Sequence, residues 1–98
     1  MYIQLDQAKD HLRIEQDWSV DDEYILSLIE VAESAVEVHT NEKLESIAKR
    51  LGSIPPPLLQ ATLLMVGNLY QNREMVGGKV HELPFNYQYL IDLYRNYN

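Results

Sequence analysis

The sequence has no cysteine, few basic residues and no long apolar run, and each of these absences excludes a class of protein. Without cysteine there can be no disulfide bond, no thiolate zinc site and no thiol nucleophile. The longest strongly apolar run, Leu58–Val66, is far shorter than the roughly 20 residues needed to cross a bilayer. The first ten residues include Asp6, Lys9 and Asp10, unlike the basic and then apolar stretches of a secretory leader. We therefore expect neither a membrane protein nor a secreted one.

Basic residues are scarce and scattered, whereas acidic residues are concentrated in the first half of the chain. Residues 1–45 hold twelve acids and three bases, residues 46–98 hold five bases and three acids, and the net charge is −7. A surface that grips phosphates needs clustered lysine and arginine to displace condensed counterions. The basic residues here occur singly or as the pair Lys49–Arg50, which disfavours tight nucleic-acid binding by the single chain. The acid excess is sufficient to keep a small helical protein in solution.

Apolar spacing of three and four residues recurs from Leu5 to the end of the chain, and strict strand alternation is absent over any useful length. Such spacing is typical of amphipathic helices. A chain of 98 residues fits one compact domain, which we place over residues 1–98. The predicted fold is all-α, a small bundle of four to five helices with one long amphipathic helix and one strongly apolar central helix.

The long amphipathic helix is predicted over Val20–Thr40. Ser19 precedes it as an N-cap, and Asp22 stands where a capping box carries its acid. Its core stripe consists of Ile25, Leu28, Ile29, Ala32, Val36 and His39. Glu30, Glu33 and Glu37 lie largely off that stripe, so we expect them to face water.

The strongly apolar helix is predicted over Leu58–Glu74, after a rigid, extended connector at Ile54–Pro57 whose last proline can be the first helical residue. It is expected to end before Gly77–Gly78. Its apolar side chains include Leu58, Leu63, Met65, Val66 and Tyr70. A core of this size does not obviously cover them all, so we expect the helix to be the centre of the bundle and also to contact a partner.

Three shorter helices complete the predicted fold. The first covers Leu5–Leu12 and the next covers Glu42–Leu51, with Gly52 as its left-handed cap. The last follows a loop over Met75–Pro84 and has Asn86 as its N-cap. The predicted core face of this last helix is formed by Tyr87, Leu90, Ile91 and Tyr94.

No group of residues has the spacing of a catalytic or metal site. His11, His39 and His81 lie in separate predicted elements, without the spacing of a helix-borne metal pair, so we expect them at helix ends or on the surface. Glu30, Glu33 and Glu37 share a helix face, but the Glu-x-x-His pairs of a di-iron site are missing. We expect no enzyme activity, no cofactor and no bound metal.

Several short segments occur in an order and spacing that resemble one known family. They are Leu5–Ile14, Asp21–Asp22, Val38–Asn41, Pro56–Leu58, Asn68–Glu74, Leu83–Phe85 and Tyr94–Arg95. Together they cover nearly the whole chain. Their order resembles the small head-tail connector family of tailed bacteriophages and prophages, whose members are also described as DNA-packaging proteins or portal adaptors.

The resemblance implies a structural role. About a dozen identical subunits would form a ring beneath the portal of the filled capsid, each contacting its neighbour through two different patches. The ring would extend the channel through which genomic DNA passes without sequence-specific binding, and it would present a surface for the next neck or tail protein. The protein would be found in the virion neck after assembly and in the cytoplasm of the bacterial host during assembly.

The sequence also offers candidate residues for these contacts. We expect the subunit or portal interface to include Tyr70, Arg73, Glu74, Met75, Val76, Gly77, Gly78, Leu83 and Phe85. Arg73–Glu74 is either an ion pair between subunits or a polar helix end. Glu30, Glu33 and Glu37 are candidates for a channel wall that repels phosphate.

An alternative function of a different class fits the same sequence. The chain could be a monomeric or dimeric all-α adaptor that binds a peptide or a helix in an apolar groove beside Leu58–Tyr70. The two functions differ in oligomeric state, because only the connector is expected to form rings or to bind a portal.

Overall fold

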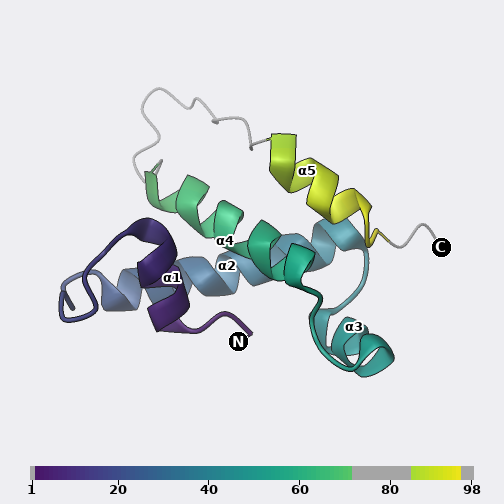
Figure 1. Ribbon diagram of the computed structural model, residues 1–98, viewed down its shortest axis with the longest axis horizontal. Helices are drawn as coiled ribbons and strands as arrows, with labels where there is room; N and C mark the ends of the chain where they lie inside the picture. The colour runs from purple at the N-terminus through teal and green to yellow at the C-terminus, as the bar shows by residue number, and fades with distance from the viewer. Residues whose placement is uncertain (1, 72–84, 96–98) are drawn as a thin grey trace.

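The computed structural model describes residues 2–71 and 85–95, and within them it contains five α-helices and no strand (Figure 1). The helices are α1 (Leu5–Leu12), α2 (Asp22–Thr40), α3 (Leu44–Leu51), α4 (Pro56–Gln71) and α5 (Phe85–Asp92). The predicted all-α bundle, with a long amphipathic helix and an apolar central one, is confirmed.

The core lies mainly between α2 and α4, with α5 packed on α4 and α1 packed on both α2 and α4. The side chains of α2 that enter it recur every three or four residues, so they share one face of the helix. The fully buried core residues of these helices include Ile25, Ile29, Ala32, Val36, Leu58, Ala61, Val66, Tyr87 and Ile91. Helix α3 lies at one end of the molecule (Figure 1), where its Leu44 and Ile47 are buried in the core.

Helix α2 begins two residues later than predicted, because tertiary contacts fix its start. Ser19 does not cap it, and the carbonyl of Ser19 instead accepts a hydrogen bond from the amide of Asp22 at 3.3 Å. Asp21 is the N-cap residue, and its carboxylate accepts a hydrogen bond from the hydroxyl of Tyr70 at 2.9 Å. Asp22 lies 3.0 Å from the ammonium of Lys9.

The other helix boundaries agree with the sequence to within a few residues. Helix α1 has the predicted bounds, and Gly52 ends α3 with a φ of 89° as expected for its left-handed cap. Helix α4 begins at Pro56, two residues before the predicted start at Leu58, because Pro56 and Pro57 both fit in the first turn, where their missing N–H groups are not needed. Helix α5 begins at Phe85, so Asn86 lies inside the helix and is not its cap. The predicted loop and the predicted end of α4 lie outside the described residues.

One expectation about α4 is wrong for the described residues. The helix is the centre of the bundle, as predicted, but it does not carry the surplus of exposed apolar surface. Leu58, Met65 and Val66 are buried, and Leu63 and Tyr70 are partly buried against the core. The reason is that α4 has packing partners in α1, α2 and α5. The large apolar side chains that are exposed belong to other parts of the described chain.

Candidate functional site

A buried lysine fixes the loop between α1 and α2. Lys9 is only 2% exposed, and its ammonium donates hydrogen bonds to the carbonyls of Gln16 at 2.8 Å and Trp18 at 2.6 Å. The same ammonium forms an ion pair with Asp22. A buried charge is tolerated when it is paired and hydrogen-bonded in this way. We call residues 13–21 the Trp18 loop.

The Trp18 loop carries two exposed apolar side chains. Trp18 is 54% exposed and Val20 is 75% exposed. The side-chain amide of Gln16 also ties the loop to α1. It donates hydrogen bonds to the carbonyl of Asp6 at 3.0 Å and to the carboxylate of Asp10 at 2.9 Å. Tryptophan is among the residues that most often dominate the energy of a protein interface. The loop therefore presents an apolar anchor on a fixed backbone.

Two of the three acids predicted for a channel wall have partners within the chain. The Glu33 carboxylate accepts hydrogen bonds from the backbone amides of Tyr2 and Ile3 at 2.7 and 2.8 Å. The Glu37 carboxylate accepts from the amide of Leu44 at 2.8 Å and so caps the start of α3. Glu30 is exposed on α2. Glu33 thus positions the N-terminal residues, and Glu37 positions the start of α3. The sequence pattern, which places both acids off the core stripe, did not indicate these contacts.

His39 and Tyr87 connect the end of α2 to α5. Nδ1 of His39 and the hydroxyl of Tyr87 are 2.6 Å apart, and the two rings pack edge to face at 5.5 Å. Tyr87 is fully buried, and this burial raises the pKa of Tyr87 to about 12. His39 lies at a helix end as predicted, but it is exposed, so its predicted place on the core stripe is wrong. The sequence gave no sign of its partner 48 residues away.

His11 packs closely against α4 at Gly67. A Cβ atom at Gly67 would lie 3.2 Å from Nε2 of His11, so a glycine at this position lets α1 approach the central helix. His81 lies outside the described residues. Within the described part of the chain, no group of three or more histidines and acids could hold a metal ion, and no helix has the length and apolar character to span a membrane.

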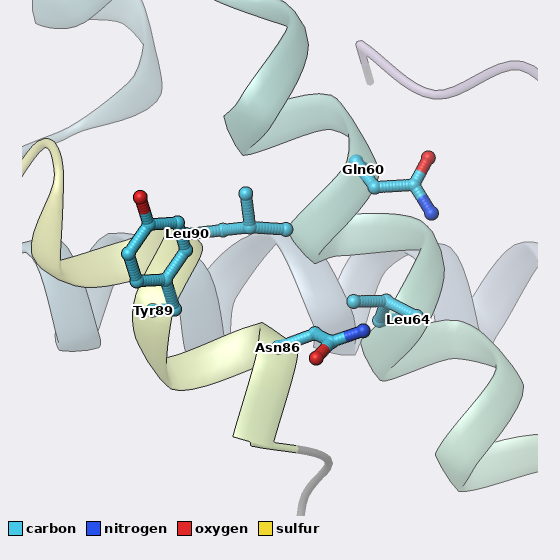
Figure 2. A pocket seen from close by; sticks show the side chains of 5 residues that line it. All are labelled: Gln60, Leu64, Asn86, Tyr89 and Leu90. Carbon is cyan, nitrogen blue, oxygen red and sulfur yellow. The ribbon is translucent and has the colours of Figure 1, made fainter.

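A hollow lies between α4 and α5 (Figure 2). Its volume is about 430 Å³, and it is lined by Gln60, Leu64, Asn86, Tyr89 and Leu90. Tyr89 lies at the edge of the hollow and is 59% exposed. Leu64 and Leu90 form an apolar part of the lining. Such a hollow corresponds to the groove beside α4 that the alternative function requires.

Most of the predicted interface residues lie outside the described part of the chain. These are Arg73, Glu74, Met75, Val76, Gly77, Gly78 and Leu83. Phe85 is the first residue of α5. Tyr70 is partly buried and bonded to Asp21, with its ring 6.3 Å from that of Tyr24. Tyr70 therefore has a role within the chain, and its place in an interface stays a prediction.

Comparison with known families identifies the chain at the level of its family. A family model described as phage gp6-like head-tail connector protein matches residues 2–95. No curated protein and no solved structure gives a significant match. The role of this family is structural: its members are components of the virion neck and associate with other phage head and tail proteins. The match covers almost the whole chain, and the protein belongs to the phage gp6-like head-tail connector family.

Proposed function

We propose that about a dozen copies of the chain form a ring beneath the phage portal, in which each copy contacts its neighbour through two different patches. The ring extends the channel for the genome and presents a surface to the next neck or tail protein. The copies are made in the host cytoplasm and dock on the filled capsid there. The observation that carries this proposal is the family match over residues 2–95.

The distribution of exposed apolar side chains supports an assembling protein. In the described residues they occur at several separate places, namely Tyr2, Trp18, Val20, Val31, Val38, Leu51, Tyr89 and Leu93. Contacts that are not self-complementary require at least two such patches on each copy. A monomeric protein can expose single apolar residues, so the distribution supports the proposal without carrying it.

The proposal is tested by measuring the mass of the protein by light scattering across a range of concentrations, with and without a purified portal. We expect a ring of uniform size, either from the protein alone or on the portal, because some rings form only on their docking partner. Negative-stain images of the mixture should show an added layer at one end of the portal. A protein that stays monomeric at every concentration and does not bind the portal would contradict the proposal.

The acids of α2 suggest how the channel avoids retaining DNA. A ring repeats the net charge of −7 in every copy, and a negative wall repels phosphate. Because Glu33 and Glu37 hold backbone amides, we propose Glu30 as the acid that faces the channel. Rings should not retain DNA at low salt, and Glu30→Gln should increase retention. If retention is absent and unchanged in that variant, another surface lines the channel.

The hollow between α4 and α5 favours one second function, that of an adaptor for a peptide or a helix. Leu64 and Leu90 would contact an apolar side chain of the ligand, and the amides of Gln60 and Asn86 would bond its backbone. Fragments of portal and neck proteins can be tested by NMR against the labelled chain. Saturable shifts at Leu64, Tyr89 and Leu90 from a chain that never forms rings would favour the adaptor over the connector ring.

A further inference from the structure

We infer that successive copies associate through the two ends of α2, the acidic end of one copy binding the basic arm of the next. The acidic end is residues 13–23, which comprise the Trp18 loop and the first two residues of α2. The basic arm is residues 43–51, which comprise Lys43 and α3. This inference rests on the proposed function, because it names the patches that join the copies of the ring.

The acidic end combines acidic and apolar side chains on a fixed backbone. Its exposed charged residues are three acids, Glu15, Asp17 and Glu23, and one base, Arg13. Trp18 and Val20 are exposed among them. The bonds that Lys9 makes to the carbonyls of the loop hold this arrangement before any partner binds. A preorganised anchor loses less conformational entropy on binding than a mobile one.

The basic arm has the opposite composition. Its exposed charged residues are three bases, Lys43, Lys49 and Arg50, and one acid, Glu45. Arg50 is already paired with Glu42 at 2.9 Å, so Lys43 and Lys49 are the bases that we assign to the contact. The ion pair between Lys49 and Glu45 is 78% and 73% exposed, and a pair this exposed contributes little energy, so Lys49 can exchange it for another partner. Leu51 is 46% exposed at the end of the arm. The arm lies at one end of the molecule (Figure 1), with Leu44 and Ile47 buried in the core and its charged side chains exposed, so those charges are accessible to a second copy.

The two surfaces complement each other in charge and in apolar content. Three acids and a base on the acidic end face three bases and an acid on the basic arm. The acidic end carries the exposed Trp18 and Val20, and the basic arm carries the exposed Leu51. Complementary charges select the partner and its register. Because the surfaces lie at opposite ends of α2 (Figure 1), one copy cannot satisfy both by itself, and a second copy of the chain is the occupant that we infer.

The length of α2 is compatible with a closed ring. Its 19 residues span about 28 Å. If successive contacts have this spacing, about twelve of them close a circle roughly 110 Å across. Copies that extend inward from this circle by the 33 Å of the molecule's intermediate dimension would leave an opening of about 40 Å, which is wide enough for duplex DNA.

Charge reversal tests the pairing directly. One variant carries Glu15→Lys with Asp17→Lys, and another carries Lys43→Glu with Lys49→Glu. Each alone places like charges in contact, so we expect sedimentation velocity to show association weakened by roughly tenfold or more. Mixing the two variants pairs each altered acidic end with an altered basic arm, so the mixture should recover association. The chain with all four substitutions should recover it as well.

Controls separate this inference from the proposed function. The variant Asp92→Lys with Ser27→Lys and Ser34→Lys changes the net charge as much as the acidic-end variant, but its three exposed positions lie outside both surfaces, and it should leave association unchanged. If wild-type copies form rings and neither variant weakens them, or if mixing does not restore them, the inference is wrong and the ring stands. If wild-type copies form no ring even on a portal, the proposed function and the inference both fail.

The apolar anchor is tested by Trp18→Ala, with Tyr89→Ala as the matched aromatic control on α5. Both side chains are more than half exposed, so both variants should keep the wild-type circular dichroism spectrum and melting temperature. Trp18→Ala should weaken association by roughly tenfold or more, and Tyr89→Ala should not. Equal effects of the two substitutions, or no effect of the first, would exclude Trp18 as the anchor.

Discussion

Replacing Lys9 by methionine isolates the contribution of its buried ammonium. Methionine keeps an unbranched side chain of similar length, so the apolar stem of the lysine is largely retained. The charge is lost, and with it the hydrogen bonds to the carbonyls of Gln16 and Trp18 and the ion pair with Asp22. The carboxylate of Asp22 and two carbonyl groups then lose their partner in a partly buried site.

The expected loss of stability is about 3 kcal/mol. Removing one partner of a buried ion pair costs about 3–5 kcal/mol when the other charge stays buried. We take the lower part of that range because the side chain of Asp22 is 29% exposed and water partly solvates it. For a domain of this size the melting temperature should fall by roughly 12–24 °C.

Urea denaturation followed by far-UV circular dichroism measures this loss. Lys49→Met is the matched control, because Lys49 pairs with Glu45 on an exposed surface and its loss should cost less than about 0.5 kcal/mol. Adding Asp22→Asn to Lys9→Met should recover part of the stability, since the unpaired carboxylate is removed. A loss below about 1 kcal/mol in Lys9→Met, or no recovery in the double variant, would refute the view that Lys9 holds the Trp18 loop.

Other substitutions test separate contacts in the bundle. The pKa of Tyr87 is raised from 10.0 to about 12, so the contribution of its neutral hydroxyl to the free energy of unfolding is fully present below pH 10. Between pH 10 and 12 the free energy of unfolding should fall by up to about 1.4 kcal/mol per pH unit. Melting curves recorded over this pH range should not show that decrease in Tyr87→Phe. Glu33→Gln should cost about 1–2 kcal/mol, and hydrogen exchange at the amides of Tyr2 and Ile3 should accelerate more than exchange in the core. Gly52→Ala should lower the free energy of unfolding, measured by urea denaturation, by about 1 kcal/mol. The φ of 89° at this position is strained for a residue with a side chain, although the space around it is open. An unchanged urea midpoint would show that the backbone of the turn relaxes to accept alanine.

Periodicity was sufficient to predict most of the fold, because it records which side chains face the core. The stripe of α2 is buried as predicted from Ile25 to Val36, although His39 at its end is exposed, and the face of α5 is buried or partly buried. Helix starts were less predictable. Ser19 and Asp22 have the spacing of a capping box, yet the contacts of Asp22 with Lys9 and of Asp21 with Tyr70 decide where α2 begins. Those contacts join different helices, so local sequence does not reveal them.

The polar contacts that organise the surface were the hardest to predict. A lysine in a short amphipathic helix is normally solvated, and the burial of Lys9 depends on the path of the loop that follows. In the same way, Glu33 and Glu37 lie on the face predicted to be solvated, but each reaches backbone amides of another segment. The apolar character of α4 correctly indicated the centre of the bundle and wrongly indicated where apolar surface remains exposed.

The position of Trp18 also makes assembly observable without a label. The sequence contains one tryptophan, and in the isolated chain its ring is half accessible to water. Indole emission shifts to shorter wavelength when water is excluded, so the intrinsic fluorescence of the protein reports on a single known position. Stopped-flow mixing of the native chain with a portal that lacks tryptophan would thus give the rate at which this position is covered.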